Sequence, residues 1–73
     1  MSDETGSLAK LTRREAEILA LLPAGISNQA IADQLGVAEV TVKLHLRSIY
    51  RKIGVTGRPG AIRIWRLAQG RGR

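Results

Sequence analysis

The side chains best suited to recognition chemistry lie between residues 40 and 51, where cations alternate with branched aliphatic residues. Lys43 and Arg47 are one helical turn apart, and both can donate hydrogen bonds to the O6 and N7 acceptors of guanine. Val40 and Leu44 have the same spacing and suit contact with thymine methyl groups. The alternative is an ordinary solvated helix face, but such a face has little use for two aliphatic side chains.

Catalytic and metal chemistry find little support in the sequence. The chain has no Cys, a single His and six scattered carboxylates. It has no Gly-rich phosphate loop followed by a lysine, and no acid or serine placed to partner His45, so we expect no enzymatic activity. We expect His45 to be a packed, neutral side chain, and we expect no metal, no cofactor and no small-molecule ligand within this chain.

Charge is distributed unequally along the 73 residues. Residues 1–39 carry all six acids and three bases, whereas residues 40–73 carry nine bases and no acid. A half-chain of one sign repels itself, and a polyanionic partner is the natural explanation. The competing explanation is solubility charge, which evenly distributed arginines would have supplied as well.

Length and hydropathy limit the architecture. A chain of this length is one small domain near the lower limit for a single core, and self-association is the remaining way to bury more apolar surface. The sequence has no apolar run of the roughly 18 residues that span a bilayer, and no signal-peptide pattern at its start. We therefore expect no membrane partner and a cytoplasmic location.

Helical periodicity without any strand pattern predicts an all-α domain. Thr12 and Glu15 have the spacing of a capping box, and Ser27 is placed to cap a second helix. Four helices are expected, at about 13–22, 28–35, 39–53 and 59–69. Around them we expect a disordered tail or linker at residues 1–9, a folded domain at 10–70 and a frayed basic tail at 71–73.

The second and third predicted helices are joined by only three residues, "GVA". So short a turn forces the helices to cross steeply, as in a helix-turn-helix motif. The inward face of the third helix is predicted to consist of Val42, Leu46, Ile49 and Ile53. At 100° per residue, the opposite face carries Val40, Lys43, Leu44, Arg47 and Arg51. In this motif the start of the second helix meets base edges in the major groove, so base contacts are predicted for Val40, Lys43, Leu44 and Arg47.

A second group of residues suits phosphate oxygens. Hydroxyls and free backbone N–H groups at helix starts bind phosphate well, and cations beside the groove do the same. For Ser27, the capping role alone is a sufficient explanation. The predicted phosphate contacts are Ser27, Asn28, Thr41, Arg51 and Lys52.

From Leu11 to about Gln69, the chain resembles the LuxR-type (GerE-type) DNA-binding domain of bacterial transcription regulators. The resemblance rests on "LTRREAEIL", "GISNQAIADQLGV", "TVKLHLRSIYRKIGV" and "RPGAI". It implies sequence-specific binding of double-stranded DNA, with Lys43, Leu44 and Arg47 at base-facing positions. It also implies that Thr41 contacts the DNA backbone.

The same resemblance implies a two-fold homodimer formed through the fourth helix. The apolar surface of that helix is wider than one core contact needs, which agrees with a dimer. We expect its interface to include Ile64, Leu67 and Ala68, and RNA polymerase is a further candidate partner. The sequence leaves open whether the domain acts alone or is the output domain of a longer protein such as a response regulator.

Several positions depart from the family pattern. Ala38 stands where the family usually has a serine N-cap, which should cost the third helix roughly 1 kcal/mol. Pro23 and the pair at 59–60 are expected to shorten the first and fourth helices. We interpret Arg58 as structural, with Glu15 as its expected partner.

Two other functions compete with this one. Region 4 of an alternative sigma factor has similar motifs and would recruit core polymerase, but it normally lacks a fourth helix. A basic interaction module would instead bind polyanions, membrane surfaces or acidic proteins without any preference for a DNA sequence.

Overall fold

A computed structural model of the protein describes residues 8–71, in which all regular elements are helical. The α-helices are α1 (Arg13–Leu21), α2 (Asn28–Leu35), α3 (Glu39–Ile53) and α4 (Arg58–Arg71), and a 3-10 turn, η2 (Leu22–Ala24), follows α1. The predicted all-α class with four helices is confirmed. No helix in this part of the chain is long and apolar enough to span a bilayer.

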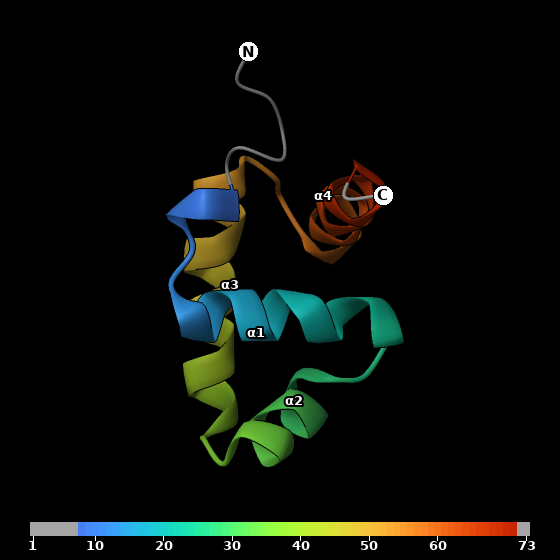
Figure 1. Ribbon diagram of the computed structural model, residues 1–73. Coiled ribbons are helices and arrows are strands. Elements are labelled where there is room, and N and C mark those ends of the chain that lie inside the picture. The colour runs from blue at the N-terminus through green and yellow to red at the C-terminus, as the bar shows by residue number, and fades with distance from the viewer. Residues whose placement is uncertain (1–7, 72–73) are drawn as a thin grey trace.

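The longest helix, α3, organises the domain because it packs against the other three α-helices. Figure 1 shows α1 crossing α3 near its middle and α2 lying beside its N-terminal end. The fourth helix lies toward the opposite end of α3, and it also packs on α1 and η2. This arrangement leaves one long side of α3 without a covering helix.

The core is formed where these helices meet. All four predicted inward residues of α3 are buried, and full burial of such a side chain contributes about 1.5–3 kcal/mol. The buried apolar residues are Ile18, Leu19, Leu22, Ile31, Ala32, Val42, Leu46, Ile49, Ile53, Ala61 and Ile64.

The helix starts follow the sequence signals closely. The Thr12 hydroxyl accepts from the backbone N–H of Glu15 (3.1 Å), and the Glu15 carboxylate accepts from the N–H of Thr12 (2.9 Å), which confirms the capping box. The Ser27 hydroxyl caps α2 by accepting from the N–H of Ala30 (3.1 Å). Ala38 has N-cap geometry at the start of α3 but offers no side-chain acceptor.

Three parts of the chain have boundaries that differ from the expectation. The first α-helix ends at Leu21, and the chain continues through η2 with Pro23 in the first turn of that element. The fourth helix is longer than expected at both ends: it begins at Arg58, with Pro59 in the first turn where no backbone N–H is needed, and it continues through Gly70 to Arg71. At the N-terminus, residues 8–10 form a 3-10 turn and Leu8 packs against the core, so order begins earlier than residue 10. The rest of the two expected tails, residues 1–7 and 72–73, lies outside the described residues.

Candidate nucleic-acid interface

The link between α2 and α3 has the geometry of a helix-turn-helix. Gly36 ends α2 in the left-handed conformation (φ 71°), which a side chain rarely adopts. The backbone N–H of Val37 then donates to the carbonyl of Ala32 (3.0 Å), which closes the turn. Within three residues the chain therefore reverses from α2 into the N-terminal end of α3.

The outer face of α3 carries the four residues predicted to contact bases, and all of them are exposed. Val40 and Leu44 are 60% and 58% exposed, which is unusual for large aliphatic side chains. Lys43 forms an exposed ion pair with Glu39 (3.9 Å), and such pairs contribute little to stability. The amino group of Lys43 can therefore leave Glu39 at little cost when an acceptor is offered. These four residues, Val40, Lys43, Leu44 and Arg47, are called the outer row below.

The residues predicted to contact phosphate lie in different environments. Arg51 is exposed, and Thr41 is half-buried one position before Val42 of the core. The Ser27 hydroxyl is engaged in capping, as its position in the sequence indicated. Lys52 was expected at a phosphate, but its ammonium group is instead paired with Glu15 of α1.

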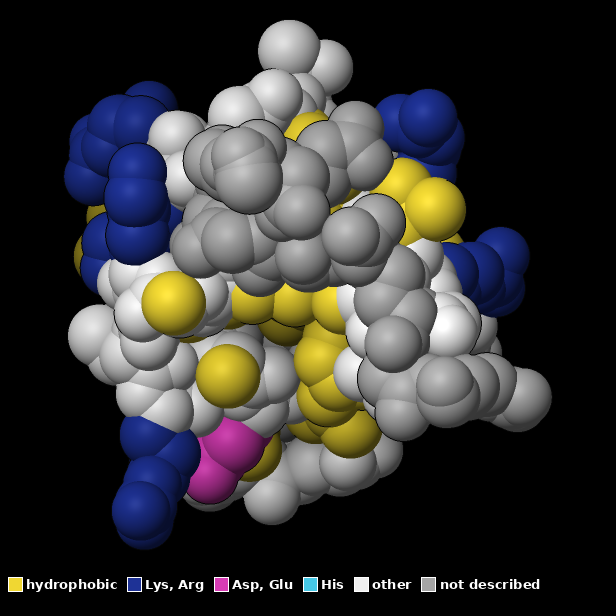
Figure 2. Space-filling view, turned by 45° about the horizontal axis from the view of Figure 1, so that its top comes forward, with side chains coloured by type: hydrophobic (Ala, Val, Ile, Leu, Met, Phe, Trp, Pro, Cys, Tyr) yellow, Lys and Arg dark blue, Asp and Glu magenta, His cyan; other side chains and the backbone are white. Residues whose placement is uncertain are grey.

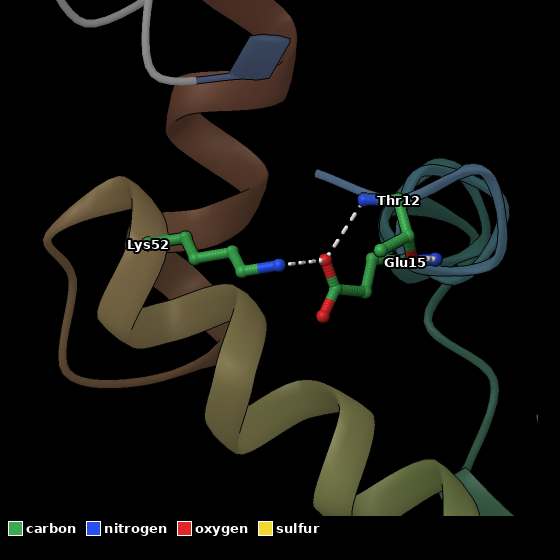
Figure 3. Close-up of polar contacts among 3 residues, drawn as sticks. All are labelled: Thr12, Glu15 and Lys52. Carbon is green, nitrogen blue, oxygen red and sulfur yellow. Dashed lines mark hydrogen bonds and ion pairs between the residues drawn. The ribbon is translucent and has the colours of Figure 1, made fainter. Parts of the chain in front are cut away.

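Lys52 turns toward α1 and binds a buried carboxylate. Its Nζ lies 2.8 Å from Oε1 of Glu15, the same oxygen that accepts from the N–H of Thr12 (Figure 3). The Glu15 side chain is only 6% exposed. Leaving that carboxylate would strand a buried charge, which is costly, so Lys52 holds α3 against α1.

The same contacts shift the ionisation of Glu15. Burial alone would raise its pKa, because it disfavours the charged form. Hydrogen bonds from Lys52, the Thr12 backbone and Ser48, with the charge of Lys52, outweigh burial and lower the pKa of Glu15 from 4.5 to about 2. Glu15 is therefore ionised at any ordinary pH.

Comparison with known families agrees with this geometry. The sequence model of the family "Bacterial regulatory proteins, luxR family" (GerE) matches residues 9–65. The chain belongs to the luxR family of bacterial regulatory proteins. It is accordingly a DNA-binding helix-turn-helix domain of a transcription regulator, and its family is not one of enzymes.

In this luxR-family domain, Arg58 joins the start of α4 to the start of α2. Its Nη1 donates to the carbonyl of Ile26 (2.7 Å), and its Nη2 donates to Oδ1 of Asn28 (3.0 Å). Arg58 is structural, as expected, but its expected pairing with Glu15 is wrong because Lys52 holds that carboxylate. Both arginine contacts span at least 30 positions of sequence, so no local spacing signals them.

A surface hollow of about 310 Å³ lies between α2 and the side of α3. It is lined by Asn28, Lys43, Leu46, Arg47 and Tyr50. Tyr50 was missed in the sequence, although it follows Lys43 and Arg47 at helical spacing, on the same side of α3. Burial raises the pKa of Tyr50 and the nearby Arg58 opposes that rise, so the hydroxyl is protonated at neutral pH.

The fourth helix of the luxR-family domain presents less apolar surface than predicted. Ile64 is 4% exposed and packs in the core of its own chain, so its assignment to a dimer interface is wrong. Leu67 is 39% exposed and Ala68 is half-buried. Figure 2 turns the end of the molecule that holds α4 toward the viewer, and hydrophobic side chains reach the surface on this face.

Proposed function

We propose that the domain binds specific sequences in double-stranded DNA, with α3 lying in the major groove. The observation that carries this proposal is the outer row, whose two cations and two aliphatic side chains are all exposed on a helix buried along its other side. The cations suit guanine O6 and N7, and the aliphatic groups suit thymine methyl groups.

Residues beside the outer row supply the proposed contacts with the DNA backbone. Thr41 and Asn28 lie at the starts of α3 and α2, where phosphate oxygens are bound readily. Arg51 extends the cationic face one turn beyond Arg47. Ser27 is included through its place at the N-terminus of α2, whereas Lys52 is left out because Glu15 holds its ammonium group.

We further propose that two copies act as a homodimer through α4, with Leu67 and Ala68 at the contact. A two-fold dimer would place its recognition helices about 34–36 Å apart, one turn of DNA. The operator would then be an inverted repeat. Because bacterial DNA lies in the cytoplasm, we propose that the protein acts there, and contact with RNA polymerase is a further proposal.

Selection from random duplex DNA at near-physiological salt tests the proposed function. We expect enrichment of one motif with two-fold symmetry, whose half-site spacing reports the dimer geometry. Enrichment of no motif, with binding that disappears as salt rises, would contradict sequence-specific recognition. Binding to anionic vesicles as tight as to DNA would then favour the basic interaction module.

A sigma factor region 4 remains the nearest alternative among DNA-binding functions. The family match reaches residue 65, well inside α4 (Arg58–Arg71), an element that region 4 normally lacks. The match therefore favours a luxR-type regulator. Failure to bind core RNA polymerase in the absence of DNA would support this choice.

A further inference from the structure

The hollow between α2 and α3 lies next to the outer row but has a chemistry of its own. Its lining is mostly apolar and includes Leu46, and the side chains that can bring polar groups to it are Asn28, Lys43, Arg47 and Tyr50. Its volume of about 310 Å³ is roughly ten times the share of one water in the liquid. A phosphate group therefore has room in it.

Arg58 orients the side-chain amide of Asn28 at the edge of the hollow. A guanidinium has five donors and no acceptor, so every group that bonds to it must accept. The Oδ1 atom of Asn28 accepts from Arg58, which turns the two N–H donors of that amide away from the arginine. The positive charge of Arg58 acts on the nearby Tyr50 hydroxyl and favours an orientation in which the oxygen faces the arginine and the proton faces away from it.

The polar side chains at the hollow are therefore left with donors to offer a ligand there. Lys43 and Arg47 border it and can only donate, and each adds a positive charge. No acid is among the lining residues, and Glu39 is paired with Lys43 across 3.9 Å at the surface. A lining of donors with two cations binds an oxyanion and rejects a cation.

We propose that this hollow holds one backbone phosphate of the bound DNA, with Asn28 and the Tyr50 hydroxyl as its donors and Arg58 as the positioning residue. The inference rests on the proposed function, because Lys43 and Arg47 place the hollow beside the face that meets DNA. It adds Tyr50 to the interface, and it gives Arg58 a role in binding as well as in structure.

Two substitutions remove the proposed donors with little effect on packing. Tyr50→Phe deletes only the hydroxyl, and we expect DNA affinity to fall roughly two- to tenfold. Asn28→Asp keeps an acceptor for Arg58 but replaces the donors by a negative charge, so we expect a loss of roughly tenfold or more. Gln34→Glu is the matched control, because it adds the same charge at an exposed position of α2 away from the hollow. Thermal melting checks that all three variants fold.

DNA in which one backbone phosphate at a time is replaced by an uncharged group identifies the phosphate that occupies the hollow. A methylphosphonate is placed at one backbone position after another in the selected operator, and affinity is measured for wild type, Tyr50→Phe and Asn28→Asp. We expect one position in each half-site at which neutralisation weakens the wild type but costs the two variants much less. The Gln34→Glu control should respond as the wild type does.

The outcomes separate this inference from the function on which it rests. If the operator is bound specifically but every methylphosphonate weakens the variants as much as the wild type, the phosphate site is wrong and the proposed function stands. If no operator is selected at all, the proposed function itself fails.

Discussion

At the scale of single residues, Glu15 links the ionisation of one carboxylate to the stability of the domain. Its pKa is about 2 in the folded protein, below the ordinary value of 4.5, so the unfolded chain binds the proton more tightly. Ionised Glu15 therefore stabilises the fold fully above about pH 4.5, and this stabilisation is lost as the pH falls toward about 2. The difference between the two pKa values corresponds to on the order of 3 kcal/mol.

Urea unfolding of wild type and Glu15→Gln between pH 7 and pH 2 measures this effect. We expect the variant to be less stable by about 1.5–3 kcal/mol at pH 7, and the difference to shrink as the pH falls. Glu17→Gln removes an exposed carboxylate of the same helix and should change stability little at any pH. A difference between wild type and Glu15→Gln that stays constant down to pH 2 would refute the assignment.

Arg47 is expected to read a base. Arg47→Ala should weaken operator binding by about 1–3 kcal/mol and relax the preference at one base pair, measured by repeating the selection with the variant. Arg51→Ala is the comparison, because Arg51 is proposed to contact only phosphate. It should weaken binding to all sequences alike and reduce the dependence of affinity on salt. A uniform loss for Arg47→Ala would move that residue to the phosphate contacts.

The sequence predicts the exposed residues of α3 better than it predicts their polar partners. Helical periodicity places the outer row opposite the core, because orientation along one helix follows from spacing alone. The partners of Lys52 and Arg58 depend on how separate helices pack, and no local pattern encodes that. Both residues are cations near helix ends, and the sequence predicted a phosphate contact for Lys52 and the wrong partner for Arg58. The structure shows that neither is a free surface charge.

At the scale of elements, α3 begins without the side-chain cap that α1 and α2 each have. Ala38 has the extended backbone of an N-cap (φ −76°, ψ 152°) but makes no side-chain bond to the first turn. Ala38→Ser should supply that acceptor and raise the free energy of unfolding by about 1 kcal/mol. Chemical denaturation measures the change, and Ala38→Val, which like alanine offers no side-chain acceptor at this exposed position, is the control. An unchanged stability for Ala38→Ser would show that water already satisfies those N–H groups.

Capping signals predict where these helices begin more reliably than breaker residues predict where they end. The bounds of α2 and α3 agree with the sequence, because Ser27 and Gly36 mark the ends of one helix and Gly54 terminates the other. The bounds expected for α4 already placed Pro59 in the first turn, and the helix is longer because it begins at Arg58 and continues through Gly70 to Arg71. A proline in the first turn therefore does not shorten a helix, and a glycine alone does not end one.

At the scale of the whole molecule, dimerisation through α4 predicts cooperative binding to paired half-sites. Leu67→Glu places a charge on the proposed contact and should reduce affinity for a two-half-site operator about tenfold, while affinity for one half-site is retained. Gel-shift titrations of both DNA fragments measure the two affinities. Ala20→Glu, at an exposed position of α1, is the control and should change neither of the two affinities. Equal losses on both fragments for Leu67→Glu would argue against the dimer.

The two sides of α3 are separated so cleanly that one can change without the other. No member of the outer row belongs to the core cluster, so substitutions there leave no cavity and strand no buried polar group. Selection can therefore alter the DNA preference of such a domain one side chain at a time, without a prior gain in stability elsewhere. For the same reason, a combinatorial library at residues 40, 43, 44 and 47 should yield mostly folded proteins, which makes this domain a practical starting point for regulators with new operators.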